Sequence, residues 1–257
     1  MDHARLELLQ PIVFIVLLTV MSVLETVMPL ETNPRRLQHF RRNMGMTALN
    51  SLLNFGLRGV LLLAATWAQK SDVGLLSATE LSFFTTAVLG VLVLDLSNYI
   101  MHRLKHHVPF FWRFHRVHHS DAHLDVSTGV RFHPGETLLS MVLQTVVIVA
   151  FGIPFWALIL YFLVLTIMIQ LGHSNVRWPL SFDRLMRRVL VSPYMHRTHH
   201  SRLQNETDTN FGDIFSFWDK IFGTYYDRRR YQDLKTGLDG YENRQTVLRL
   251  LQIPFEK

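Results

Sequence analysis

The sequence predicts an all-α integral membrane protein with about three transmembrane helices and a helical hairpin. Four long apolar stretches occur in a chain of 257 residues, of which 49% are hydrophobic and 18% charged. Basic residues gather in alternate connections, as they do when one side of a membrane carries the positive charge. Histidines recur at helical spacing in the segments between the apolar stretches. These three observations predict membrane-spanning helices with a histidine-rich region at one membrane surface.

The first two apolar stretches are long enough to cross a hydrocarbon core of about 30 Å. Residues 8–30 read LLQPIVFIVLLTVMSVLETVMPL. They are not typical of a signal peptide, because Asp2 and Glu7 dilute the positive start and no small-x-small cleavage site follows. Residues 47–68 predict a second span, which is interrupted by Asn50, Asn54 and Arg58.

The remaining apolar stretches predict a third span and a hairpin. Residues 81–101, LSFFTTAVLGVLVLDLSNYIM, form the third span. Residues 138–172 contain no formal charge, and FGIP at 151–154 lies near their middle. Glycine followed by proline interrupts a helix, so we expect a tight hairpin of two short spans, with a re-entrant pair as the alternative.

The charges of the connections predict an orientation. Four arginines lie between the first two spans, whereas Lys70 is the only basic residue between the second and third. Segments 102–136 and 173–257 are again rich in arginine. The positive-inside rule therefore places the N-terminus outside and both histidine-rich segments in the cytoplasm. We expect a multi-pass protein of the bacterial inner membrane, or of the endoplasmic reticulum membrane in a eukaryote.

The composition excludes several classes of site. The absence of cysteine excludes disulfides, thiolate metal sites, iron–sulfur clusters and c-type haem attachment in this chain. The net charge of +6 is not gathered in a long basic run or a basic-aromatic stripe, so no nucleic-acid partner is predicted. Basic residues facing one side of a membrane account for the charge.

Histidine spacing predicts a metal centre. HRVHHS at 115–120 and HRTHHS at 196–201 share the pattern H-x-x-H-H, although their surroundings differ. Positions i, i+3 and i+4 lie on one face of a helix, so each cluster can direct its imidazoles at a common point. Neutral imidazole suits iron and zinc. Eight candidate ligands exceed the need of one ion and predict two: His102, His106, His115, His118, His119, His196, His199 and His200.

Further polar residues lie at the predicted membrane boundary. His133, in RFHPGE, and His173, in GHSN, flank the 138–172 stretch, and we expect each to bind a metal or to contact a ligand. Glu136 and Asn175 stand close to them in sequence. Either side chain can accept a hydrogen bond from the free N–H of a ligand and so fix its orientation.

Asp95 is a candidate for the same supporting role. It lies seven residues before His102, two helical turns back on the same face. A carboxylate inside a membrane span is costly and usually functional. The alternative is a polar contact to Asn98 or Arg58.

The other histidines have weaker patterns. His107 and His123 fit equally well as ligands or as ordinary polar residues, because they stand near the clusters but out of phase with them. His3 and His39 lie outside every cluster and are interpreted as surface or hydrogen-bonded residues. Histidine-rich loops can also form pH-sensitive surface patches, a possibility that the helical spacing argues against.

The motifs, in their order, resemble the fatty acid hydroxylase/sterol desaturase superfamily of integral-membrane, histidine-rich di-iron oxygenases. They read DLSNYIMHRLKHH, FWRFHRVHHS, HSN, HRTHHS and NFGDIFSFWDKIFGTY, over about residues 90–226. The resemblance implies a non-haem di-iron centre, a helical membrane fold with a cytosolic cap, and the eight phased histidines as ligands, joined by His173 and His133. Some members carry H-x-x-x-H where this chain has Ile169 before His173.

We expect a single membrane-embedded domain over residues 1–257, with the catalytic region at 81–226. Residues 227–257 are interpreted as a polar tail with a short amphipathic end. The aromatic residues of NFGDIFSFWDKIFGTYYD predict a helix that lies at the membrane surface or packs in the cap.

The resemblance implies O2-dependent hydroxylation or desaturation of a lipid or other long apolar substrate, and we favour hydroxylation. Two electrons must come from a separate donor, of the cytochrome b5, ferredoxin or reductase type, because the chain has neither G-x-G-x-x-G nor cysteine. Zinc can replace iron in purified protein, since affinity alone does not select the metal.

Two other functions are open to a histidine-rich membrane protein. A zinc transporter or zinc hydrolase without oxygenase activity is the main alternative, although H-E-x-x-H is absent and a transporter places ionisable ligands at mid-membrane. A b-type haem protein would need single histidines that face each other from two spans, whereas these histidines form clusters outside the spans.

Overall fold

The computed structural model describes residues 3–228, 231, 233–241 and 245–256, and of residues 3–8 it describes the backbone alone. Every regular element in this part of the chain is a helix. The long helices are α1 (His3–Val27), α2 (Arg36–Lys70), α3 (Phe83–His107), α5 (Pro134–Phe151) and α6 (Phe155–His173). The short helices are α4 (Pro109–His119), η1 (Thr128–Val130), α7 (Leu180–Met186), α8 (Pro193–His199), α9 (Gln204–Thr207), α10 (Phe217–Ile221), α11 (Val247–Gln252) and η2 (Ile253–Phe255).

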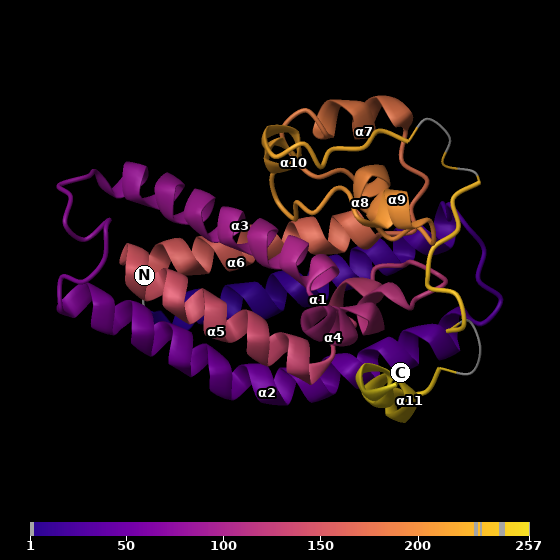
Figure 1. Cartoon of the computed structure of the whole chain (residues 1–257), viewed down its shortest axis with the longest axis horizontal. Coiled ribbons are helices and arrows are strands. Elements are labelled where there is room, and N and C mark those ends of the chain that lie inside the picture. Colours follow the sequence, from indigo (N-terminus) through magenta and orange to yellow (C-terminus); the bar gives the residue numbers. More distant parts are fainter. Residues whose placement is uncertain (1–2, 229–230, 232, 242–244, 257) are drawn as a thin grey trace.

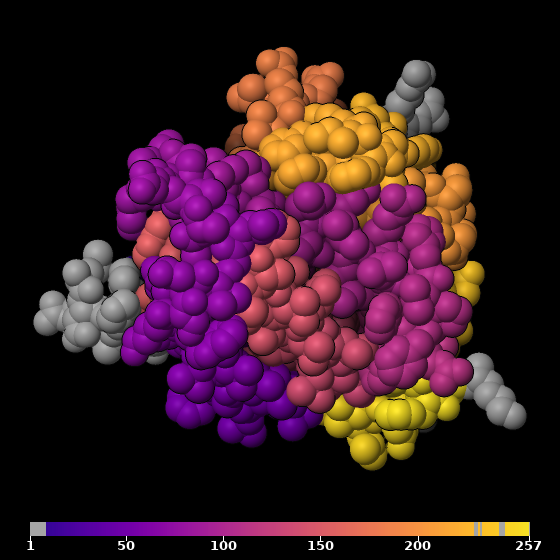
Figure 2. Space-filling model, turned by 60° about the vertical axis from the view of Figure 1, so that its left-hand side comes forward, coloured from indigo at the N-terminus to yellow at the C-terminus, as the bar shows by residue number. Residues whose placement is uncertain are grey.

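Five helices are long and apolar enough to cross a membrane, and they are α1, α2, α3, α5 and α6. They run side by side, and α7 to α10 form a cap at the end opposite to the N-terminus (Figure 1). Large apolar side chains face outward along the spans, with Phe55 of α2 88% exposed. Figure 2 shows this outer surface where α5 and α6 appear between α2 and α4. The prediction of an all-α integral membrane protein is confirmed.

Two spans are longer than hydropathy predicted. Helix α2 begins at Arg36 instead of residue 47, because His39, Asn43 and Met46 in its first turns are buried against the rest of the protein. Helix α3 continues to His107, beyond the predicted end at residue 101. In these extensions the side chains are buried against other parts of the protein and not in lipid, so the sequence there need not be apolar.

The hairpin between α5 and α6 forms as predicted. Gly152 ends α5 in the left-handed conformation, with φ at +64°, which glycine adopts without a steric penalty. The following Pro154 precedes the first turn of α6. Backbone N–H groups of Leu75 and Leu76 donate to the carbonyls of Ala150 and Phe151 and so satisfy the end of α5.

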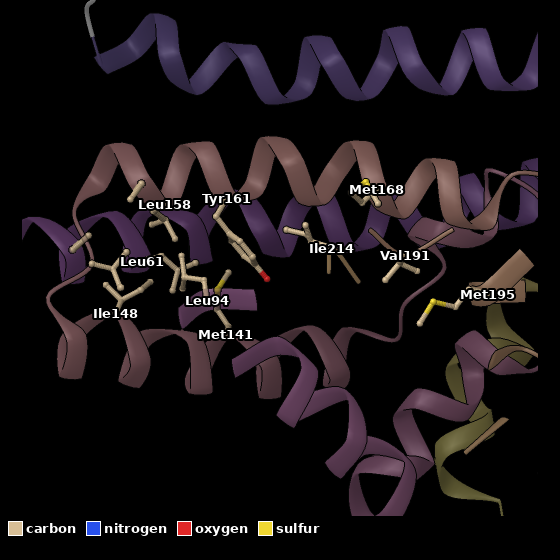
Figure 3. Packing of buried hydrophobic residues seen from close by; sticks show 13 residues of the cluster. Leu61, Leu94, Met141, Ile148, Leu158, Tyr161, Met168, Val191, Met195 and Ile214 are labelled. Atoms are coloured by element: carbon tan, nitrogen blue, oxygen red, sulfur yellow. The ribbon is translucent and has the colours of Figure 1, made fainter. Parts of the chain in front are cut away.

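One apolar cluster joins the spans to the cap. Between the spans it includes Leu61, Leu94, Ile148, Leu158 and Tyr161. The same cluster includes Met168 and three residues of the cap, which are Val191, Met195 and Ile214 (Figure 3). Removal of these side chains from water holds the cap against α6.

The amphipathic end of the tail packs beside the histidine-bearing α4. Leu250 and Ile253 are buried in a second cluster with Met46 of α2 and Val117 of α4. The guanidinium of Arg116 donates to the carbonyl oxygen of Glu256 at 2.8 Å and to that of Ile253. The C-terminal helix therefore holds α4 against α2.

Candidate metal centre

Nine histidines of the described chain form two groups. The five-histidine group contains His102, His106, His115, His119 and His199, and the four-histidine group contains His118, His173, His196 and His200. Within each group, one nitrogen of every ring lies within 4.8 Å of those of the others. The two groups adjoin, since the rings of His119 and His200 stack with their centroids 4.4 Å apart.

Each H-x-x-H-H triplet is divided between the groups, not directed at one point. In α4, His115 and His119 face the five-histidine group, whereas His118 faces the other. In α8 and its C-cap, His196 and His200 face the four-histidine group and His199 the five-histidine group. At 3.6 residues per turn, positions i and i+4 differ by about 40° around the axis, whereas i+3 and i+4 differ by about 100°. The triplet can therefore serve two sites.

Backbone carbonyls fix the orientation of three rings. The Nδ1–H groups of His102, His173 and His199 donate to the carbonyl oxygens of Phe211, Ile169 and Thr209 at 2.8, 2.8 and 2.7 Å. A carbonyl oxygen only accepts, so Nδ1 carries the proton in each ring. The Nε2 lone pair then points into the group and is available to a metal ion.

Carboxylates support two further rings. Glu136 Oε1 accepts from Nδ1 of His115 at 2.8 Å and from Nζ of Lys105 at 3.0 Å. Asp208 Oδ1 accepts from Nδ1 of His106 at 3.1 Å. A carboxylate on the outer nitrogen fixes the tautomer and makes the inner nitrogen a better metal ligand.

The inward nitrogens fit bound cations. Nε2 of His173 lies 3.1 Å from Nε2 of His118 and 3.0 Å from Nε2 of His196, although one lone pair can accept only one N–H. Several other buried nitrogens have no hydrogen-bond partner in the described chain, namely Nε2 of His102, Nε2 of His199 and both nitrogens of His200. Unpaired polar atoms are costly to bury. A metal ion would satisfy these lone pairs, so the donor set fits metal binding.

The protonation state agrees with this fit. Burial lowers the pKa values of His118 and His196 well below the ordinary value of histidine, and neighbouring imidazoles lower them further. Burial also lowers the pKa of His199, to about 3. These imidazoles are therefore neutral at physiological pH, the state that binds metal.

The model of the fatty acid hydroxylase family matches residues 87–224, which is more than half of the chain and includes all nine histidines. The chain belongs to the fatty acid hydroxylase family. The resemblance seen in the motifs is thereby confirmed. No solved structure matches the chain significantly.

Relatives in this family act on lipids according to their names. An ornithine lipid hydroxylase of Rhizobium tropici is 31% identical over 66% of this chain and 50% of its own length. Alkylglycerol monooxygenase of Homo sapiens is 30% identical over 54% of this chain and 30% of its own length. Cholesterol 25-hydroxylase of Rattus norvegicus is 32% identical over 62% of this chain and 53% of its own length. The chain thus spans about half or less of the length of these curated relatives.

The remaining histidines whose side chains are described lie outside the two groups. Nδ1 of His133 accepts from the backbone N–H of Gly135 at 2.9 Å, and its Nε2 donates to the Leu251 carbonyl at 3.3 Å, so His133 caps α5. His107 and His123 are exposed. The side chain of His3 lies outside the described part of the chain.

Two predicted supporting residues have other partners. Asp95 accepts from the N–H groups of Ile214, Phe215 and Trp218 at 2.9 to 3.3 Å, and so ties α10 and the segment before it to α3. The side chain of Asn175 bonds the backbone of Glu31. Within the described chain neither side chain hydrogen-bonds a histidine of the two groups. The spacing of Asp95 and His102 suggested that Asp95 contacts a ligand histidine, and this contact is therefore not made.

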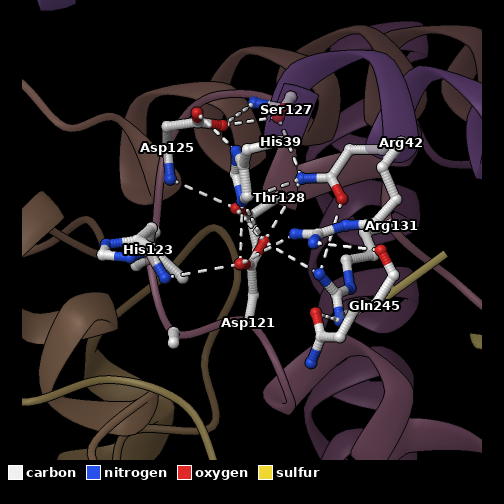
Figure 4. A network of polar contacts seen from close by, with 12 residues as sticks. His39, Arg42, Asp121, His123, Asp125, Ser127, Thr128, Arg131 and Gln245 are labelled. Carbon is white, nitrogen blue, oxygen red and sulfur yellow. Dashed lines mark hydrogen bonds and ion pairs between the residues drawn. The ribbon is translucent and has the colours of Figure 1, made fainter. Parts of the chain in front are cut away.

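A buried polar network beside the histidines was missed by the sequence reasoning (Figure 4). His39 lies between Asp121 and Asp125, at 2.8 and 3.0 Å. Arg131 lies 3.3 Å from Asp121 and is fully buried. Burial alone would raise the pKa of Asp121, but the charges of His39 and Arg131 hold it well below its ordinary value.

This network fixes the start of α2 to the segment that follows α4. The sequence suggested that His39 is a surface or hydrogen-bonded residue. In the structure it is buried and hydrogen-bonded. The signal available in the sequence was position, because Asp121 directly follows HRVHHS. Asp208, which holds His106, likewise follows HRTHHS within a few residues.

A cavity of about 560 Å³ connects both histidine groups to the interior of the spans. His102 and His115 of the five-histidine group line it, as do three residues of the other group, His118, His173 and His196. Apolar side chains from four spans also line the cavity, including Phe14, Leu61, Met141, Phe162 and Leu165. An apolar chain inside this cavity would lie within reach of both groups.

Proposed function

We propose that the protein is a membrane-bound, non-haem di-iron oxygenase that hydroxylates a lipid or other long apolar substrate. The cavity carries this proposal, because it joins nitrogen donors of both histidine groups to apolar side chains of the spans. The relatives support hydroxylation over desaturation, since two are named as hydroxylases and one as a monooxygenase. The same names favour oxidation over zinc transport or hydrolysis.

The proposed metal ligands are the nine histidines of the two groups. Glu136 and Asp208 would hold His115 and His106 in position, and His133 is left out because both its nitrogens are engaged. Five nitrogen donors in one group exceed the four that zinc usually takes. Imidazole also suits iron, which agrees with a di-iron centre.

The proposed reaction converts R–H, O2, two electrons and two protons into R–OH and water. The two iron ions, when bound, supply the reduction of dioxygen and the oxidation of the C–H bond. The chain holds the rings in place, keeps bulk water from the buried histidines and aligns the substrate beside them. A separate donor of the cytochrome b5, ferredoxin or reductase type would deliver the electrons to the cap.

Elemental analysis and oxygen labelling test this function. The purified protein is expected to contain two transition-metal ions per chain. With a membrane lipid extract, a reducing system and isotopically labelled dioxygen, one labelled oxygen atom is expected in a lipid product by mass spectrometry. A single metal ion, a stoichiometric haem spectrum or a product without the label would contradict the proposal.

We also propose that the cap and the histidine groups face the cytoplasm. The chain contains no cysteine, so single cysteines can be placed at exposed positions in the connection between α2 and α3 and in the cap. An impermeant thiol reagent is expected to label Ser71→Cys in intact cells, and Gln204→Cys only after lysis. Labelling of Gln204→Cys in intact cells would reverse the orientation.

A further inference from the structure

Three polar residues interrupt the second span, and all three line the cavity. Asn50, Asn54 and Arg58 are spaced by four residues along α2, which places them on one face of the helix. That face borders the cavity. The polar face of α2 therefore faces the cavity inside the protein and not only the lipid.

Asn50 has partners within the protein. Its Nδ2 donates to the carbonyl of Phe132 at 2.5 Å, and its Oδ1 accepts from Thr137 at 2.9 Å. Thr137 stands next to Glu136, which holds His115. Asn50 therefore marks the level of the histidine groups along the membrane normal.

Asn54 and, on α5, Gln144 line the same cavity, and their side-chain amides make no hydrogen bond within the described chain. Both side chains are partly exposed. Amide groups inside a membrane span are costly unless they are hydrogen-bonded, and residues of this kind usually mark a binding site or pathway. Two such amides in one cavity indicate a polar ligand group between the helices.

Helix register gives the depth of these amides. Gln144 lies eight residues beyond Glu136 on α5, about 12 Å along the axis. Asn54 lies one turn, about 6 Å, beyond Asn50. On the other side of the cavity, Gln10 donates to Thr166 at 2.9 Å, and Thr166 lies seven residues, about 10 Å, before His173. Gln144, Asn54 and Thr166 therefore lie one to two helical turns from the level of the histidines.

We propose that Asn54 and Gln144 form a subsite that binds a polar, oxygen-bearing group of the substrate. The proposal rests on the proposed function, because it takes the cavity as the substrate site. The carbon that is oxidised is then separated from the bound polar group by about 6 to 12 Å along the helix axes, and apolar chain occupies the cavity between them. The substrate class is an amphiphile with a hydroxyl, carbonyl or carboxylate group at a distance from the oxidised carbon.

This arrangement selects against pure hydrocarbon. A ligand that pairs with the amides replaces the hydrogen bonds that they would otherwise make to water. A hydrocarbon removes that water and leaves the amides unpaired, which a site built for hydrogen bonding penalises strongly. We expect at least a tenfold preference for the amphiphile.

Binding to the metal-free protein tests the subsite without turnover. Radiolabelled hexadecan-1-ol, hexadecanoate and hexadecane are compared in a scintillation proximity assay. The wild type is expected to bind the alcohol or the carboxylate at least tenfold more tightly than the hydrocarbon. In the double variant Asn54→Leu with Gln144→Leu the preference should disappear. Gln69→Leu, an exposed α2 residue outside the cavity lining, is the matched control and should retain it.

Regiochemistry supplies the second measurement. The metal-loaded wild type is expected to oxidise the bound amphiphile at carbons remote from its polar group, and the double variant to spread oxidation along the chain. Equal affinity for alcohol and hydrocarbon would mean that water satisfies the amides and would overturn the subsite, as would oxidation beside the polar group in both proteins. If no lipid is oxidised, the proposed function fails, while the binding comparison still decides the subsite.

Discussion

Replacing His118 or His199 with alanine is expected to abolish lipid oxidation and to lower the metal content below two ions per chain. Each residue belongs to a different histidine group, so each variant should affect a different ion. Both rings are buried, and His199 is held by the carbonyl of Thr209, so no neighbouring side chain can replace the lost nitrogen in the same geometry. Membrane insertion should persist, because the spans are unchanged.

The matched controls are His107→Ala and His123→Ala. Both residues are exposed histidines of the same region, outside the two groups. Elemental analysis and the oxidation assay should give nearly normal values for both. Full metal content and turnover in His118→Ala and His199→Ala would show that the histidine groups are not the reactive centre.

Asp121→Ala is expected to destabilise the protein by about 3–5 kcal/mol. The substitution removes the ion-pair partner of Arg131, which is fully buried, and one of the two carboxylates beside His39. An uncompensated buried charge costs far more than the loss of an exposed ion pair. Thermal unfolding in detergent should shift downward by roughly 10 °C.

Asp239→Ala provides the control for this measurement. Asp239 lies 3.4 Å from Arg202, but its side chain is 88% exposed, so its removal should leave the unfolding temperature nearly unchanged. If Asp121→Ala unfolds at the same temperature as Asp239→Ala, the network around His39 does not hold α2 to the segment after α4.

Hydropathy predicted the spans well because a bilayer imposes one local requirement on every residue that faces it. The four apolar stretches became the five helices α1, α2, α3, α5 and α6, and Gly152 with Pro154 separated the last two. The extra turns of α2 around His39 were not predictable in this way. Protein contacts bury these residues, and hydropathy does not register such contacts.

Spacing within the helices singled out the eight phased histidines, and all eight lie in the two groups together with His173. The same reasoning placed Asp95 beside a ligand, because the two residues share a face of α3. In the structure that carboxylate faces α10 and the segment before it instead. A shared helix face gives the direction of a side chain only to within about a quarter turn around the axis. The neighbouring segment of the chain decides which group that side chain contacts.

The sequence alone therefore determined what its local periods encode, namely which segments cross the membrane and which histidines share a helix face. Only the tertiary structure decided that each triplet serves two groups, that His133 caps α5, and that Asp121 closes a buried network with His39. The physical reason is that helical period fixes the angles between side chains of one helix. The partner at each angle depends on the rotation and height of other helices, which packing between distant segments sets.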